Sequence, residues 1–205
     1  MTTSITCIAD LHGLYHDLVI EPTDILICAG DITGHSFKED VRAFNLWFNK
    51  QPATYKILIA GNHDSYLERH PSPKAIFSYP FYLQDECITI DGLKIYGTPY
   101  QPIFGFWSFN LPEEELVKKW DMIPEDIDIL ITHCPPYGIC DFTTDGEHAG
   151  SDSLLKKIKD KNLVHIFGHI HEGYGVEFEE HNLYINCSIC NESYQPVNKP
   201  VRFCL

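Results

Sequence analysis

The chain has 205 residues, of which 44% are hydrophobic and 21% charged, enough for one large domain and too few for two ordinary ones. Its formal net charge of −14 argues against binding a long nucleic acid, which such a field would repel. No apolar run is long enough to span a bilayer and the N-terminus lacks the features of a secretory signal. We therefore expect a single domain over residues 1–205 in a soluble, cytoplasmic protein with no membrane partner.

The first half of the chain predicts buried strands and a helix. Residues 4–9 and 24–29 are short, nearly continuous apolar runs, which are typical of strands covered on both faces. Residues 38–51 carry a helical apolar pattern that a proline ends, and residues 56–60 predict a third buried strand. Residues 87–96 predict a hairpin around an Asp91-Gly92 turn.

The second half continues the alternation. Residues 112–122 begin with a proline and three glutamates, which favours a helix start, and residues 127–132 predict a buried strand. Residues 151–161 open with a Ser/Asp cap and close with lysines, as a helix does. The remaining predictions are a strand over 164–167, a hairpin over 176–186 and a last strand over 201–204. This alternation indicates an α/β protein with two mixed sheets packed together and helices outside.

The eight cysteines are scattered along the chain. Cys7 and Cys28 lie inside apolar runs, where a free thiol behaves as a small hydrophobic side chain. Cys187 and Cys190 have the spacing of half a zinc clip, but no second pair completes it, so buried or structural thiols are favoured. Reduced cysteines agree with a cytoplasmic location.

Each predicted buried strand ends in a polar cluster, and ligands in such folds gather beyond the carboxyl ends of strands. The clusters are Asp10-Leu11-His12, Gly30-Asp31, Gly61-Asn62-His63-Asp64, Thr132-His133 and Gly168-His169-Ile170-His171.

Taken alone, each cluster could also have a purely structural role. Asp10 could cap a helix, Gly30-Asp31 could be an ordinary turn, and His133 could be a buried imidazole bonded to backbone. If the backbone after the first strand is still extended, Asp10 and His12 point the same way and could grip one ion. Five clusters in series, each at a strand end, favour two metal ions that share one carboxylate, an arrangement suited to phosphate-ester hydrolysis.

The order of the clusters resembles the calcineurin-like metallophosphoesterase superfamily, whose pattern is D-x-H, GD, GNH[ED], a strand-ending His and GHxH. Segments such as 97–102, 107–110, 168–175 and 186–188 are similar to its metallophosphoesterase-domain-containing branch. The resemblance implies a four-layer α/β/β/α sandwich of two mixed sheets flanked by helices. It also implies phosphodiester hydrolysis, with cyclic nucleotides among the substrates.

The resemblance further implies a role for each matching residue. Asp10, His12 and His171 would bind the first ion, Asn62, His133 and His169 the second, and Asp31 would bridge them. His63 would be the general acid and Asp64 its orienting partner.

The cofactors expected are two divalent transition-metal ions, with Mn favoured and Fe, Zn, Co or Mg as alternatives. The reaction expected is attack on phosphorus by a hydroxide that bridges the metals. The substrate would be small and phosphorylated, with a nucleotide as one candidate. It would contact Asn62 and His63, and Phe106 and Trp107 would form an apolar wall, although these aromatic residues could equally be core or dimer contacts.

Two other functions stay open at this level. One is a module that holds a nucleoside monophosphate and turns it over slowly. The other is a protein-interaction scaffold on the same fold, although such scaffolds tend to lose ligands. An oligomeric assembly is compatible with the sequence.

Overall fold

The computed structural model describes residues 2–77 and 81–205. Its first sheet has the order β13-β1-β2-β3-β4. β1 to β4 are parallel, and β13 is antiparallel to β1 at the edge. The strands are β1 (Ser4–Ile8), β2 (Thr23–Ala29), β3 (Ala53–Ile59), β4 (Phe81–Tyr82) and β13 (Val201–Cys204).

The second sheet has the order β11-β12-β10-β9-β6-β5. Its four inner strands are parallel, and the two edge strands close antiparallel hairpins. The strands are β5 (Glu86–Ile90), β6 (Leu93–Thr98), β9 (Ile129–Thr132), β10 (Val164–Phe167), β11 (Gly175–Glu179) and β12 (Asn182–Asn186).

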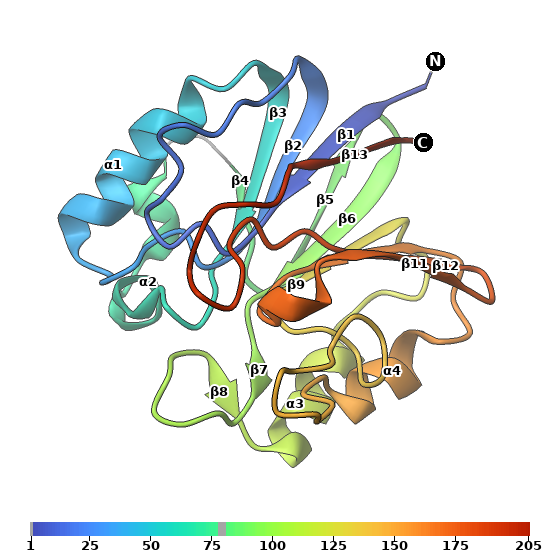
Figure 1. The fold of residues 1–205 in the computed structure, drawn as a ribbon. Helices are drawn as coiled ribbons and strands as arrows, with labels where there is room; N and C mark the ends of the chain where they lie inside the picture. The colour runs from blue at the N-terminus through green and yellow to red at the C-terminus, as the bar shows by residue number, and fades with distance from the viewer. Residues whose placement is uncertain (1, 78–80) are drawn as a thin grey trace.

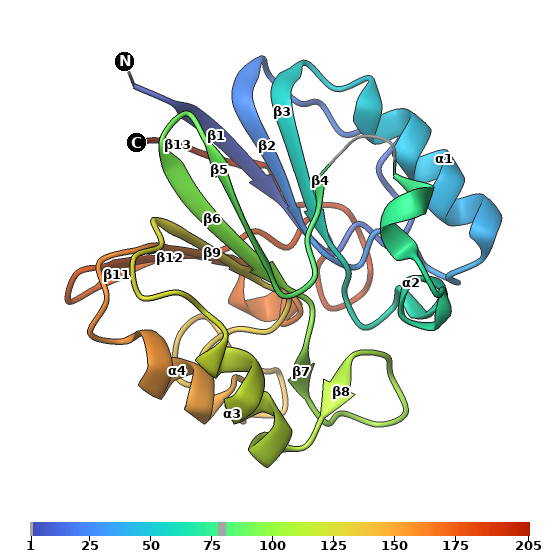
Figure 2. The ribbon, with the colours of Figure 1, turned by 180° about the vertical axis from the view of Figure 1, so that it is seen from behind.

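Helices cover the outer faces of the two sheets (Figures 1 and 2). The first sheet carries α1 (Lys38–Asn49) and the short α2 (Ser65–Arg69), and the second carries α3 (Glu113–Asp121) and α4 (Asp152–Ile158). Smaller elements are the 3-10 turns η1 (Pro73–Ile76) and η2 (His171–Gly173) and the pair β7 (Gln101–Pro102) and β8 (Asn110–Leu111).

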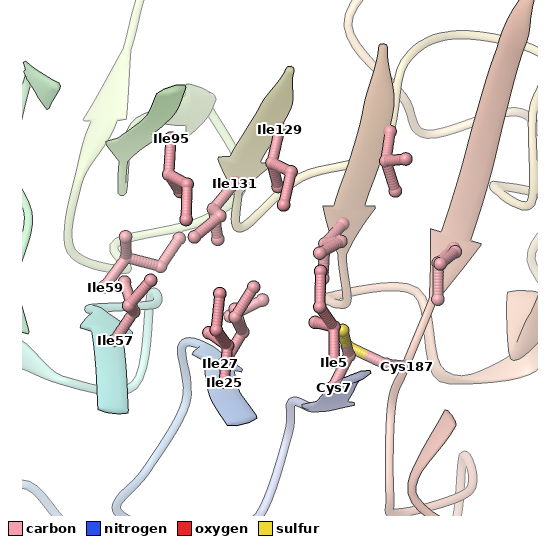
Figure 3. Close-up of a cluster of buried hydrophobic side chains, with 14 of the residues drawn as sticks. Ile5, Cys7, Ile25, Ile27, Ile57, Ile59, Ile95, Ile129, Ile131 and Cys187 are labelled. Atoms are coloured by element: carbon pink, nitrogen blue, oxygen red, sulfur yellow. The ribbon is translucent and has the colours of Figure 1, made fainter. Parts of the chain in front are cut away.

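Three apolar clusters hold these four layers together. The central cluster joins the sheets, with Ile25 and Ile27 of β2 facing Ile129 and Ile131 of β9 (Figure 3). Alternate residues of the same strands point outward. Leu26 packs in the cluster beneath α1, and the cluster beneath α3 and α4 includes strand residues of the second sheet. Because successive side chains of a strand point to opposite faces, burial on both faces requires continuous apolar runs. The four-layer sandwich expected from the sequence is thereby confirmed.

Most predicted elements are present, with ends that differ by a few residues. The Asp91-Gly92 turn has positive φ at both residues, 51° and 86°, as a two-residue hairpin turn requires. The N-cap predicted for α4 is also present, because Ser151 accepts a hydrogen bond of 3.2 Å from the N–H of Leu154.

The sequence analysis missed α2, η1, η2, β4, β7 and β8, which are too short to show a periodic pattern. Within the described residues, no helix is long and apolar enough to cross a membrane. All eight cysteines are free.

Candidate metal centre

Polar side chains from both sheets meet where the parallel strands end. Asp10, Asp31 and Asn62 follow β1, β2 and β3 of the first sheet, and His133 and His169 follow β9 and β10 of the second. The carboxyl ends of parallel strands share one edge, so these distant segments reach one place. The structure brings together all seven side chains selected as candidate metal ligands.

The first group consists of Asp10, His12 and His171, whose potential ligand atoms lie within 4.8 Å of one another. Nε2 of His12 is 3.1 Å from Nε2 of His171, which in turn is 3.7 Å from Oδ1 of Asp10. Nδ1 of His171 donates to the carbonyl oxygen of Asn191 over 2.8 Å. Since that carbonyl can only accept, the neutral ring keeps the lone pair of Nε2 free for a metal.

The second group consists of Asn62, His133 and His169. Oδ1 of Asn62 is 2.9 Å from Nε2 of His133 and 2.9 Å from Nδ1 of His169. Nδ1 of His133 donates to the carbonyl oxygen of Ala29 over 2.9 Å, which again leaves Nε2 as the ligand atom of the neutral ring. An amide oxygen and two imidazole nitrogens suit a divalent transition-metal ion.

Asp31 lies between the two groups. Its Oδ2 is 3.9 Å from Nε2 of His12 and 3.4 Å from Nε2 of His133. Its Oδ1 accepts a 2.7 Å hydrogen bond from the backbone N–H of His63, which fixes the direction of the carboxylate. One carboxylate thus faces a ligand of each group, as a residue shared by two ions must.

One further observation shows that the first group fits a cation. Oδ2 of Asp10 accepts hydrogen bonds from the N–H of His169 (2.9 Å) and the hydroxyl of Ser188 (2.6 Å). Oδ1 of the same carboxylate is buried without a hydrogen-bond partner. An unpartnered buried carboxylate oxygen is unfavourable, and a cation held by the first group would complete it.

The titratable groups show how the site balances its charge. Burial would raise the pKa of Asp10, but attraction to His171 and His133 holds it at about 2. Burial would lower the pKa of His133, but Asp31 and Asp10 raise it to about 9. Asp10 likewise raises the pKa of His171 to about 9 against the effect of burial. Near pH 7 the metal-free site therefore holds two carboxylates and two imidazolium ions, and divalent ions would replace those protons.

Four of the candidate ligands have left-handed backbone. The φ angles of Asp10, His12, Asp31 and His169 are 51°, 45°, 52° and 69°, a conformation that costs roughly 1–2 kcal/mol for a residue with a Cβ. The expectation that an extended backbone aligns Asp10 with His12 is wrong. The chain turns instead, because the N–H groups of residues 10–12 bond to the carbonyl oxygens of Gly30 and Asp31.

Asp64 has a different role from the one expected. Its buried carboxylate accepts hydrogen bonds from the backbone N–H groups of Gly61 (2.9 Å), Ile32 (3.3 Å) and Thr33 (3.1 Å) and from the Thr33 hydroxyl (2.9 Å). Burial and the charge of Asp31 raise its pKa to about 7. The expectation that Asp64 orients the ring of His63 is not met, because the loop turns this side chain inward to join the loops after β2 and β3.

The ring of His63 is held by other rings. It stacks on Trp107 with centroids 4.2 Å apart and planes at 28°, and it meets His12 edge-on at 4.5 Å. A nitrogen of His63 lies within 4.8 Å of ligand atoms of His12 and Asp31. His63 therefore lies beside His12 and the shared carboxylate of Asp31, where it can reach a group bound next to them.

An open cavity of about 480 Å³ adjoins the candidate metal centre. Asp31, Asn62, His63, His169 and His171 line its floor, and the wall includes Phe104 and Trp107. The other residues that line the cavity are Pro102, Ile103, Thr143, Asp145, Glu147, His148, Ala149, Ile170, Glu172, Glu192 and Tyr194.

The two aromatic residues expected to contact the substrate differ in their positions. Trp107 lines the cavity, whereas Phe106 is fully exposed and is not among the described residues that line it. The turn over residues 104–107 leaves the Phe106 side chain exposed, so its contact with substrate stays a prediction. Phe104 lies on the cavity side of this turn.

Sequence reasoning missed two residues of the site. Ser188 bonds to Asp10, and its only signal was the resemblance of segment 186–188. The ring of Tyr194 lies 4.7 Å from that of His12 and 5.2 Å from that of His171. Nothing in the polar segment around Tyr194 marked it, because only the packing of the C-terminal segment brings it to the cavity.

Comparisons with known proteins agree with this geometry. A family profile described as calcineurin-like phosphoesterase matches residues 3–173. Human metallophosphoesterase domain-containing protein 1 is 37% identical over 227 residues, which cover 97% of this chain and 70% of the human protein. A UPF0046 protein of Caenorhabditis elegans is 36% identical, over 96% of this chain and 58% of its own length.

A solved structure supports the fold alone. The 5′-nucleotidase of Candida albicans superposes with a TM-score of 0.53 and 14% identity, over 98% of this chain and 51% of that protein. This chain thus spans about half the length of that nucleotidase. Because the profile and the relatives cover nearly the whole region that supplies the candidate ligands, the chain belongs to the calcineurin-like phosphoesterase family, whose chemistry is metal-dependent phosphoester hydrolysis.

Proposed function

We propose that this protein is a metal-dependent phosphodiesterase that hydrolyses small phosphodiesters, cyclic nucleotides among them. The observation that carries the proposal is the convergence of seven potential ligands beside an open cavity, with one buried oxygen of Asp10 that has no hydrogen-bond partner. Such a ligand set suits a pair of divalent ions, for which Mn is our first choice.

The roles proposed for the residues follow from their places. Asp10, His12 and His171 would hold one ion, Asn62, His133 and His169 the other, and Asp31 would touch both. When bound, the ions would supply an activated water and positive charge for the phosphoryl oxygens. His63 lies beside His12 and Asp31 and lines the cavity, where its ring N–H can protonate a leaving oxygen, a contribution of about 10²–10⁴ in rate.

The charge of the cavity favours diesters over monoesters. Four carboxylates, Asp145, Glu147, Glu172 and Glu192, are among its lining residues. None of the described lining residues is a lysine or an arginine. A phosphomonoester carries a charge of about −1.5 to −2 at pH 7 and would need a lysine or arginine in the cavity to balance it, in addition to the metal ions. A diester carries a single negative charge and does not. The acidic lining opposes nucleoside polyphosphates more strongly still.

The test combines metal analysis with a substrate screen. The purified protein is assayed with added Mn²⁺ on 2′,3′- and 3′,5′-cyclic nucleotides, bis(p-nitrophenyl) phosphate and p-nitrophenyl phosphate. We expect bound divalent metal, loss of activity with a chelator, and a kcat/KM for diesters at least tenfold above that for the monoester. Turnover that survives complete chelation would refute the metal requirement, and a preference for the monoester would refute the substrate class. Retention of AMP or GMP through purification without steady-state turnover would instead indicate a nucleotide-binding module.

A further inference from the structure

We propose that Trp107 is the positioning residue for the imidazole of His63 and takes the place expected for Asp64. The inference rests on the proposed function, in which His63 protonates the leaving oxygen. It assigns to Trp107 a role that acts through His63 rather than through contact with the substrate.

The contacts of the His63 ring carry this inference. Trp107 covers it with a near-parallel stack, at 4.2 Å and 28°, and His12 meets it edge-on at 4.5 Å and 75°. Each carboxylate oxygen of Asp64 already accepts two hydrogen bonds from Gly61, Ile32 and Thr33. The orientation of the His63 ring is therefore set by ring packing.

Trp107 can serve this role because the two residues that follow it are tied to the segment that carries His63. The N–H of Ser108 donates to the carbonyl oxygen of Asn62 over 3.3 Å. The N–H of Phe109 donates to Oε1 of Glu68 in α2 over 2.6 Å, and the Phe109 side chain is buried in the core beneath α1. These two anchors fix the residues that follow Trp107, so the indole and the imidazole are held by one connected unit.

The consequence for the reaction depends on the leaving group. Water adds its oxygen to phosphorus, the bond between phosphorus and the leaving oxygen breaks, and His63 gives that oxygen a proton. The proton lost by the water passes to solvent, from which His63 is reprotonated. A weakly basic leaving group such as p-nitrophenolate needs little protonation, whereas a strongly basic one needs it fully. A misplaced His63 therefore slows esters of basic leaving groups most.

The experiment compares Trp107→Leu with Trp107→Phe in the metal-loaded protein. Phe keeps an aromatic face for the stack, and Leu keeps apolar bulk without one. The substrates are methyl aryl phosphates whose phenols range from p-nitrophenol to phenol. For Trp107→Leu we expect kcat on the phenyl ester to fall about 10–100-fold, at least tenfold more than kcat on the p-nitrophenyl ester. Trp107→Phe should recover most of this loss.

Two controls separate positioning from other effects. Phe104→Leu alters the same loop and the same cavity wall but leaves the stack on His63, so the dependence of its kcat on the leaving group should match that of the wild type. In the background of His63→Ala, Trp107→Leu should add little further loss on the phenyl ester, because residues that act as a unit are not additive. Metal content and thermal unfolding are measured for every variant.

Several results would overturn the inference. They are an equal loss of kcat across the ester series, a rise confined to KM, a failure of Trp107→Phe to recover activity, or additive losses in the double variant. A wild-type protein that hydrolyses none of these diesters would instead refute the proposed function.

Discussion

The metal-free protein is expected to hold two protons that divalent ions displace. In the structure, Asp10 and Asp31 raise the pKa of His133 and His171 from 6.5 to about 9. At pH 7.5 a group with a pKa of about 9 is roughly 97% protonated, and a shift of this size corresponds to about 3 kcal/mol for each imidazole. Because two protons are displaced, lowering the pH by one unit below pH 9 should weaken the binding of the two metal ions by up to about 100-fold.

Nuclear magnetic resonance of the histidine rings gives a direct assay. In metal-free protein, two of the eleven histidines should titrate near pH 9. His12 and His169, whose pKa values burial lowers to about 4 and about 3, should stay neutral down to pH 5. Added Zn²⁺ should abolish both high-pH titrations. Calorimetry of metal binding in buffers of different ionisation enthalpy should show release of about two protons at pH 7.5 from these rings.

Asp10→Asn provides the matched control. It removes the charge that raises the pKa of His171 and keeps a side chain of the same shape, so the pKa of His171 should fall toward or below 6.5. The reasoning would be refuted if both His133 and His171 titrated at or below pH 6.5 in the metal-free wild type.

Four further predictions follow from the same contacts. The raised pKa values of His133 and His171 contribute stability that is complete below pH 6.5 and is lost as the pH rises through about 9. Calorimetry of the metal-free protein should therefore show a Tm that falls between pH 6.5 and 9.5. Asp31→Asn should fold normally, since the amide can still accept from the N–H of His63, but metal analysis should find the paired ions lost. Gly61→Ala would place its Cβ 2.3 Å from Oδ1 of Asp31 and 2.6 Å from Cε1 of His133, which should lower the free energy of unfolding by about 1–3 kcal/mol and weaken binding of the second ion. Phe106→Ala should leave kcat/KM within about twofold, because the side chain is exposed, and a tenfold loss would show that it contacts substrate after all.

The support of the site explains how its strained backbone is tolerated. Asp10 has positive φ and full burial, yet its carboxylate is held by Ser188 and by the N–H of His169. The strain of a few left-handed residues is small beside the burial of three apolar clusters around them. Gly168 shows how closely the segments approach, since a Cβ there would lie 2.2 Å from Oδ2 of Asp10.

The amino-acid sequence by itself determined the longer strands, the longer helices and the identity of the candidate ligands. Nearly continuous apolar runs such as residues 24–29 are typical of strands buried on both faces, and a polar cluster directly after such a strand lies at its end. These features are local, so they can be read without knowing which segments become neighbours.

Only the tertiary structure decided which side chains contact one another in the site. It showed that Asp64 joins two loops while Trp107 stacks on His63, and that Tyr194 lines the cavity whereas the exposed Phe106 is not among its described lining residues. It also replaced the extended backbone at Asp10 with a left-handed turn. Each of these outcomes depends on contacts between residues far apart in sequence, and no local pattern records which partner a side chain meets.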